Sequence, residues 1–290
     1  KDIILPDEDG VSLEVRSQKP VPECFYQGSE VRSKDVVIAI IKLPHISNFT
    51  DFDPFRFESD VHVRYVANPD ELRGADVIIM PGSKNTLEDL DWLWKTGIAN
   101  RIINYAENGG RVVGICGGFQ MMGRLVKDAH GVESCAGEVK GLGLLDVETI
   151  LGRDKKTYQV EAMITGIRPA PARSKQGGQG VKDMGAPFRV RGYEIHMGET
   201  SGNNKSFAAI TNRSGNPINI EDGAVSGDGR ILGTYIHGIF DNDEFRTMFL
   251  NEIRITKVLP YQGIIRFKDK KDENIKTLAR VINDSIDLPG

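Results

Sequence analysis

Short runs of β-branched and other apolar residues recur along the first half of the chain. They occupy residues 36–41, 61–66, 77–80 and 111–115, and the first and third contain no polar residue. Strands buried on both faces have this composition, because helices cover each side of a parallel sheet. We therefore predict an α/β fold with a mostly parallel sheet flanked by helices. In such folds, ligands bind at the carboxyl ends of the strands.

Helices and further strands are predicted around these runs. A helix is expected after residues 81–83, because Ser83 or Asn85 can cap it and leucines follow at helical spacing. A second helix is expected at residues 98–107, where a Gly-Gly pair follows. The rest of the chain is predicted to add antiparallel strands and two closing helices. The predicted strands are residues 144–149, 158–164, 189–195, 207–210 and 231–236, and the helices lie near 243–253 and 273–286.

Composition narrows the class of partner. The 290 residues include 37 Lys and Arg and 41 Asp and Glu, a formal charge of -4, so we predict neither nucleic-acid nor membrane binding. No apolar run approaches the roughly 18 residues that a membrane helix needs. Cys24, Cys116 and Cys135 are odd in number and far apart, which indicates a reducing compartment rather than a disulfide framework. We expect a cytoplasmic protein.

Two segments stand apart from the predicted core. Residues 1–34 have no sustained hydrophobic period and are interpreted as a linker, which leaves residues 35–290 as one domain. Within that domain, residues 166–187 contain five Gly and three Pro without apolar periodicity. We predict that this segment is a long mobile loop outside the core.

The sequence Gly114-Ile115-Cys116-Gly117-Gly118 joins a predicted strand to a predicted helix. It has the G-x-C-x-G form of a nucleophile elbow, in which glycines let neighbouring backbone approach a strained turn. The helix N-terminus favours the negative thiolate. Cys116 is therefore the candidate nucleophile, and the alternative is a buried structural cysteine beside a tight turn.

Acyl transfer also needs hydrogen-bond donors for an oxyanion. The N–H of Gly117 follows the candidate nucleophile directly. Gly82 and Ser83 follow the neighbouring strand, so one of their N–H groups is the candidate second donor.

His237 is the preferred base among five histidines, since it follows the predicted strand 231–236 and precedes a glycine. His196 shares one strand face with Glu194, which predicts either a binding edge or a half-exposed strand. Glu194, His196 and Glu199 are also candidates for a metal site. A convincing third ligand is lacking nearby, so no metal is predicted.

Five stretches, in this order, resemble the glutamine amidotransferase domain of the cobyric acid synthase family. The resemblance covers about residues 36–253 and implies a flavodoxin-like fold of the class I, triad type. It implies that Cys116 is the glutaminase nucleophile and His237 its base. Gly82, Ser83, Gly117, Gln120, Glu194 and His196 are the candidate oxyanion or substrate-binding residues. The stretches are NFTDFD (48–53), PGSKNT (81–86), GICGGFQMMG (114–123), GYEIHMG (192–198) and YIHGIFDND (235–243).

The resemblance also implies a substrate and a larger enzyme. Glutamine would supply ammonia for the ATP-dependent amidation of adenosylcobyrinic acid a,c-diamide in cobalamin biosynthesis. The chain has no G-x-x-x-x-G-K-[ST] loop, so we expect no cofactor on it. ATP, Mg and the corrinoid are expected on a missing N-terminal synthetase domain, and this chain would be the C-terminal part of a longer enzyme.

One departure from the triad pattern concerns the base. Triad relatives carry a Glu two residues after the histidine, where this chain has Ile239, so the group that orients His237 is not identified. Two other functions stay open. One is the glutaminase subunit of another synthetase, such as one that amidates cell-wall lipid precursors. The other is a non-catalytic binding module that retains the fold.

Overall fold

The computed structural model describes residues 35–133, 137–167 and 188–285. The predicted linker at residues 1–34 and most of the predicted mobile loop lie outside this part of the chain. Gly166 and Ile167, the first two residues of that loop, are described and packed. The N–H of Gly166 donates to the carbonyl of Phe207 (2.9 Å), and Ile167 is buried.

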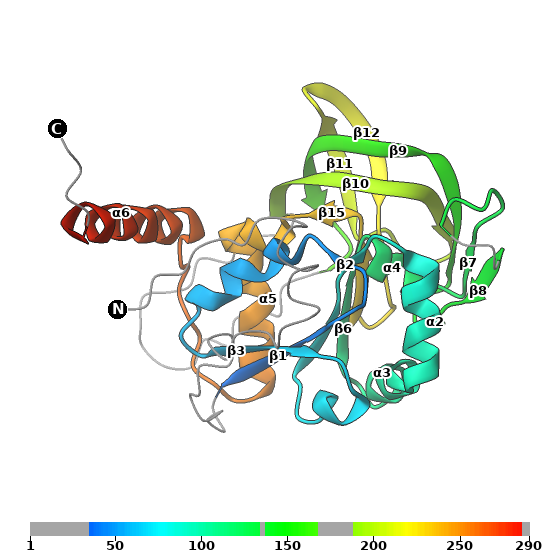
Figure 1. The fold of residues 1–290 in the computed structure, drawn as a ribbon, viewed down its shortest axis with the longest axis horizontal. Helices are drawn as coiled ribbons and strands as arrows, with labels where there is room; N and C mark the ends of the chain where they lie inside the picture. The colour runs from blue at the N-terminus through cyan, green and yellow to red at the C-terminus, as the bar shows by residue number, and fades with distance from the viewer. Residues whose placement is uncertain (1–34, 134–136, 168–187, 286–290) are drawn as a thin grey trace.

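A six-stranded sheet forms the centre of the molecule (Figure 1). Its strands lie in the order β13-β14-β6-β4-β1-β3, and every neighbouring pair is parallel except β13 with β14. Ranked along the chain, the five parallel strands follow the order 2-1-3-4-5, which is the flavodoxin-like order. The predicted sheet is confirmed. Its strands are β1 (Val36–Ile41), β3 (Val61–Val66), β4 (Val77–Met80), β6 (Arg111–Ile115), β13 (Ala224–Val225) and β14 (Ile231–Thr234).

Helices cover both faces of this sheet. In Figure 1, α2 (Thr86–Thr96) and α3 (Ile98–Glu107) lie on one side and α5 (Asp243–Thr256) on the other. The Asn85 side chain caps α2 by accepting a hydrogen bond from the N–H of Glu88, as the sequence allowed. All of β1 is buried between these layers, whereas β3 lies at the sheet edge and is partly exposed.

An antiparallel sheet in the order β12-β11-β9-β10-β15 lies beside the helix after β6 (Figure 1). The separately predicted strands 144–149 and 158–164 are wrong in extent, because β9 runs unbroken from Val147 to Ile164. The strand predicted at 189–195 continues to Gly202. The strands of this sheet are β7 (Leu125–Lys127), β8 (Glu138–Lys140), β9 (Val147–Ile164), β10 (Phe188–Gly202), β11 (Ala208–Arg213), β12 (Asn216–Asp222) and β15 (Ile236–His237).

The strand predicted at residues 231–236 is split, and this split places His237. β14 ends at Thr234, and the chain then crosses to the other sheet, where β15 pairs with β10. The buried carboxylate of Asp222 holds the crossing. It accepts hydrogen bonds from the Thr234 hydroxyl and from the N–H of Tyr235 (3.0 Å). His237 therefore belongs to the antiparallel sheet, although it follows a strand of the parallel one.

Short elements and one long helix complete the described chain. A two-stranded ribbon pairs β2 with β5 next to the sheet ends, and α6 extends away from the domain (Figure 1). None of the described helices is long and apolar enough to cross a membrane. These elements are β2 (Ile46–Ser47), η2 (Phe49–Phe57), η3 (Pro69–Leu72), β5 (Gly82–Ser83), α4 (Gly117–Met122), η4 (Ile239–Asp241) and α6 (Phe267–Ser285).

Candidate active site

Cys116 lies between β6 and α4 in a strained turn. Its φ of 52° and ψ of −111° are rare for a residue with a side chain, and strain of this kind is characteristic of functional sites. The turn needs glycine nearby, since a Cβ on Gly118 would lie 2.0 Å from the carbonyl oxygen of Met80. The Cys116 side chain is 6% exposed, and its thiol donates to the carbonyl of Ile195 (3.4 Å).

Backbone N–H groups converge next to this turn. β5 pairs with β2, and the N–H of Lys84 donates to the carbonyl of His45 (2.8 Å). Because hydrogen-bonded and non-bonded pairs alternate along an antiparallel ladder, the N–H of Ser83 points away from β2. Gly117 lies on that side, where a Cβ on it would be 2.9 Å from the Ser83 nitrogen. Ser83 and Gly117 are therefore close neighbours, and their role as oxyanion donors stays a prediction.

Gly82 lies against the candidate base. A Cβ on Gly82 would be 3.2 Å from Cε1 of His237 and 2.8 Å from the hydroxyl oxygen of Ser47. A side chain at this position would crowd the Ser47 hydroxyl and the imidazole, so glycine allows close packing at the site.

His237 is fully buried, and Asp51 holds it through two hydrogen bonds. Nδ1 of His237 is 2.7 Å from Oδ2 of Asp51, and the N–H of Gly238 donates to Oδ1 (2.9 Å). Nε2 of His237 makes no hydrogen bond with any described residue. The carboxylate therefore fixes one ring nitrogen and leaves the other available for chemistry.

The charge of His237 follows from its neighbours. Burial disfavours the imidazolium, but the Asp51 carboxylate and the Cys116 sulfur outweigh it and raise the pKa of His237 to about 10. At neutral pH the imidazole is therefore protonated. A positively charged ring beside a cysteine is the arrangement that supports a thiolate nucleophile.

Sequence reasoning missed Asp51. The residue lies in η2 within the recognised stretch 48–53, but it is 186 positions away from His237 along the chain. Its neighbour Asn48 also reaches the site, since its amide donates to the hydroxyl of Tyr193 (2.8 Å). The Tyr193 ring stacks on His237 with centroids 5.1 Å apart. η2 thus covers the imidazole from the edge and, through Tyr193, from one face.

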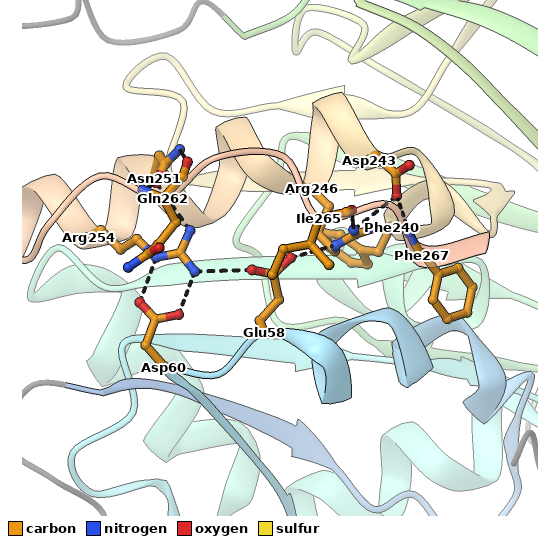
Figure 2. A network of polar contacts seen from close by, with 10 residues as sticks. All are labelled: Glu58, Asp60, Phe240, Asp243, Arg246, Asn251, Arg254, Gln262, Ile265 and Phe267. Atoms are coloured by element: carbon orange, nitrogen blue, oxygen red, sulfur yellow. Dashed lines mark hydrogen bonds and ion pairs between the residues drawn. The ribbon is translucent and has the colours of Figure 1, made fainter. Parts of the chain in front are cut away.

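Buried ion pairs fasten the end of η2 to α5 (Figure 2). Glu58 follows η2 directly, and its two carboxylate oxygens accept from Nε of Arg246 (3.0 Å) and Nη2 of Arg254 (3.2 Å). Arg254 also makes two hydrogen bonds to Asp60. Both arginine side chains are fully buried. The element that carries Asp51 is therefore anchored to the helix that follows His237 in the chain.

The other predicted site residues are nearby but already have protein partners. The Gln120 side chain donates to the Tyr235 hydroxyl (3.1 Å) and to the backbone of β10. The ring of His196 stacks on Tyr235 at 3.9 Å. Glu194 pairs with Arg213 at 2.8 Å. Alternation along β10 places Glu194 and His196 on the face opposite to Tyr193, and their role in substrate binding stays a prediction.

Glu194 lies beside two basic side chains, those of His196 and Arg213. Burial opposes the charge of Glu194, but His196 and Arg213 outweigh it, so the pKa of Glu194 lies below its usual range. The described residues contain no group of three or more His, Cys, Asp or Glu side chains arranged for a metal ion.

Comparison of the sequence with known proteins identifies a family. The family model for the CobB/CobQ-like glutamine amidotransferase domain matches residues 37–245. The chain is 41% identical over 292 residues to cobyric acid synthase from Syntrophobacter fumaroxidans and 40% identical over 293 residues to that from Thermoanaerobacter sp.. Each alignment covers 99% of this chain and 53% of the relative, so the chain spans about half the length of these curated relatives.

A solved structure supports the fold. A crystal structure titled glutamine amidotransferase aligns with a TM-score of 0.50 and 13% identity, covering 74% of this chain and 97% of the other. The matched family segment includes most of β1, the Cys116 elbow and His237. The chain therefore belongs to the CobB/CobQ-like glutamine amidotransferase domain family.

Proposed function

We propose that this domain hydrolyses glutamine with Cys116 as the nucleophile. The observation that carries the proposal is the buried hydrogen bond between Asp51 and His237, next to a cysteine held in a strained strand-to-helix turn. A cysteine that only packs in the core has no use for an adjacent imidazolium. A thiolate nucleophile uses the imidazolium as its charge partner and the carboxylate on the other ring nitrogen to orient that imidazolium.

The first half of the proposed reaction forms a thioester. The Cys116 thiolate attacks the side-chain amide carbon of glutamine, and the N–H groups of Ser83 and Gly117 bind the resulting oxyanion. Nε2 of His237 transfers its proton to the departing nitrogen as the carbon–nitrogen bond breaks. The products are ammonia and a γ-glutamyl thioester on Cys116.

The second half releases glutamate. Neutral His237 now accepts a proton from water, whose oxygen attacks the thioester carbon and expels the Cys116 thiolate. Throughout both steps Asp51 keeps the proton of Nδ1 in place, so Nε2 is the nitrogen that exchanges protons. The net reaction converts glutamine and water into glutamate and ammonia.

Active-site labelling tests this proposal. The purified protein is incubated with a chloroketone analogue of glutamine and digested, and the modified cysteine is identified by mass spectrometry. We expect Cys116 to be labelled ahead of Cys24 and Cys135, glutamine to protect it, and labelling to abolish glutamate formation. Equal modification of all three cysteines, with no protection by glutamine, contradicts the proposal and favours a non-catalytic module.

We further propose that the ammonia amidates a corrinoid in a longer enzyme. The support is the 41% identity to a protein named cobyric acid synthase over nearly the whole chain, of which this chain matches about half. ATP and Mg would act on the other half, which activates the peripheral carboxylates of adenosylcobyrinic acid a,c-diamide. A cytoplasmic location is part of the same proposal. Glutamine- and ATP-dependent amidation of this corrinoid by the longer enzyme tests it, and amidation only of another acceptor contradicts it.

A further inference from the structure

Asp89 lies outside the proposed catalytic groups, yet it contacts the ribbon that carries an oxyanion donor. It is in the first turn of α2, and its side chain is completely buried. Oδ2 accepts a hydrogen bond from the Ser83 hydroxyl at 2.6 Å. Buried carboxylates are retained where their hydrogen bonds fix a specific arrangement, because an unpaired one is costly.

The second carboxylate oxygen holds the other strand of the ribbon. Oδ1 of Asp89 accepts from the N–H of His45 (3.1 Å) and lies 3.0 Å from Nδ1 of the same residue. His45 directly precedes β2, and Ser83 ends β5. One carboxylate therefore ties both strands of the ribbon to the rigid α2 helix.

The Ser83 hydroxyl links this tie to the backbone around the oxyanion donor. It donates to Asp89 and accepts from the N–H of Asn85 (2.9 Å), so its rotamer is fixed at both ends. The Ser83 N–H that faces Gly117 belongs to the same residue. Fixing the side chain and the following backbone fixes the direction of this N–H, and an oxyanion donor must be aimed to within a few tenths of an ångström.

We propose that Asp89 is a positioning residue for glutamine hydrolysis, which orients the oxyanion donor Ser83 through its contacts to Ser83 and His45. The inference rests on the proposed glutaminase reaction. Among the contacts of Asp89 there is none to the Cys116 thiol or to the His237 imidazole within the described part of the chain. Its loss should therefore impair the step that develops an oxyanion and leave the reactivity of the Cys116 sulfur intact.

Two reactions of the same cysteine separate these effects. Glutamine hydrolysis passes through an oxyanion, whereas alkylation of Cys116 by iodoacetamide displaces iodide at a saturated carbon and forms none. For Asp89→Asn we expect kcat for glutamine to fall by at least about tenfold. The loss should not exceed the about 10²–10³-fold that removal of a whole donor costs. The iodoacetamide rate at Cys116 should stay within about twofold of the wild-type rate.

Two further variants complete the test. Glu88→Gln is the matched control, because Glu88 is the exposed neighbour on the same helix turn and its carboxylate lies 3.6 Å from the outer nitrogen of His45. It should leave both rates unchanged. Ser83→Ala keeps the backbone N–H but removes the hydroxyl that Asp89 binds. If Asp89 acts through that hydroxyl, the double variant should lose little more kcat than the more damaged single variant.

The outcomes are distinct for the two proposals. A wild-type protein that makes no glutamate overturns the proposed function itself. An active wild type with an equally active Asp89→Asn variant overturns only the positioning role. A variant that loses kcat and iodoacetamide reactivity in parallel, or one whose two single losses multiply in the double variant, also contradicts the positioning role.

Discussion

The contact between Asp51 and His237 gives the proposed base a carboxylate partner, although Ile239 stands where triad relatives would carry glutamate. Ile239 is buried in η4 and has no group that could bind the imidazole. Asp51 supplies the carboxylate from a different element, at 2.7 Å from Nδ1. In physical terms any carboxylate that reaches Nδ1 sets the tautomer, so its position in the sequence is free to differ.

Replacing Asp51 with Asn tests this contact. Burial should then dominate and lower the pKa of His237 from about 10, so the protonated imidazole is lost at a lower pH. We expect kcat for glutamine to fall on the order of 10²–10⁴-fold, and the alkaline limb of its pH profile to move to lower pH. Asp53→Asn is the control, since Asp53 lies in the same element but pairs with Arg56 (3.3 Å).

The same pair makes a prediction about stability. The pKa of His237 is raised above its ordinary value of 6.5, so its contribution to stability is complete below pH 6.5 and is lost as the pH rises through about 10. The difference in unfolding free energy between the wild type and Asp51→Asn should therefore shrink between pH 6.5 and 10. Denaturant unfolding at several pH values measures it, and a difference that grows over this range contradicts the assignment.

The two histidines near the site should differ in kind. His237→Ala should reduce the rate of glutamine hydrolysis by about 10²–10⁴-fold, because it removes the group that exchanges protons. His196→Ala should chiefly raise KM, because the His196 ring stacks on Tyr235 and is proposed to bind substrate rather than to exchange protons. Steady-state kinetics of both variants compare them. Equal losses of kcat, or a larger loss for His196→Ala, would reverse the roles.

At the scale of elements, local sequence signals predicted what is local. The apolar runs gave β1, β4 and β6, and the glycines gave the elbow, because burial on both faces and a strained turn each leave a mark within a few residues. β9 was predicted as two pieces for the same reason. Its middle, residues 152–157, is largely exposed and polar, so it shows no hydrophobic pattern. Residues 155–157 nevertheless pair with β10, and the pairing resumes at Ile150 after an irregularity in the register.

Contacts between distant elements could not be read in this way. Asp51 meets His237 only because η2 packs against the chain after β15, and the sequence carries no signal for that packing. The split of the predicted strand 231–236 is similar, since Asp222 from another strand stabilises the crossing at Tyr235. Asp89 beneath Ser83 is a third case. Each depends on tertiary pairing of buried polar groups.

The ion pairs that anchor η2 predict a stability effect. Arg246→Met leaves half of the Glu58 carboxylate without its partner in a buried site. Breaking a buried pair from one side typically costs about 3–5 kcal/mol, and we expect a loss of unfolding free energy in that range. Denaturant unfolding measures it. Lys95→Met is the control, because its pair with Asp91 is exposed and should contribute less than about 1 kcal/mol. Similar losses for both variants would contradict the anchoring role.

At the scale of the whole molecule, two sheets meet at the site. The parallel sheet supplies Cys116 at the end of β6 and Ser83 after β4, and the antiparallel sheet supplies His237 on β15. The sequence placed all three residues at strand ends but assigned His237 to the parallel sheet. This architecture sets the proposed nucleophile and its proposed base on separate layers. The N–H of Cys116 donates to the carbonyl of Thr234 (2.8 Å), the residue at which the chain leaves the parallel sheet for β15.

A pair of rates on one Cys116→Ala variant of the longer enzyme decides whether Cys116 is the glutaminase nucleophile. Amidation is measured with glutamine and, separately, with a high concentration of ammonium, after the melting temperature of the variant has been compared with that of the wild type. We predict that glutamine-dependent amidation is abolished, because no thioester can form, while ammonium still supports the ATP-dependent step. Retained turnover with glutamine, or parallel loss of both activities, would contradict the assignment.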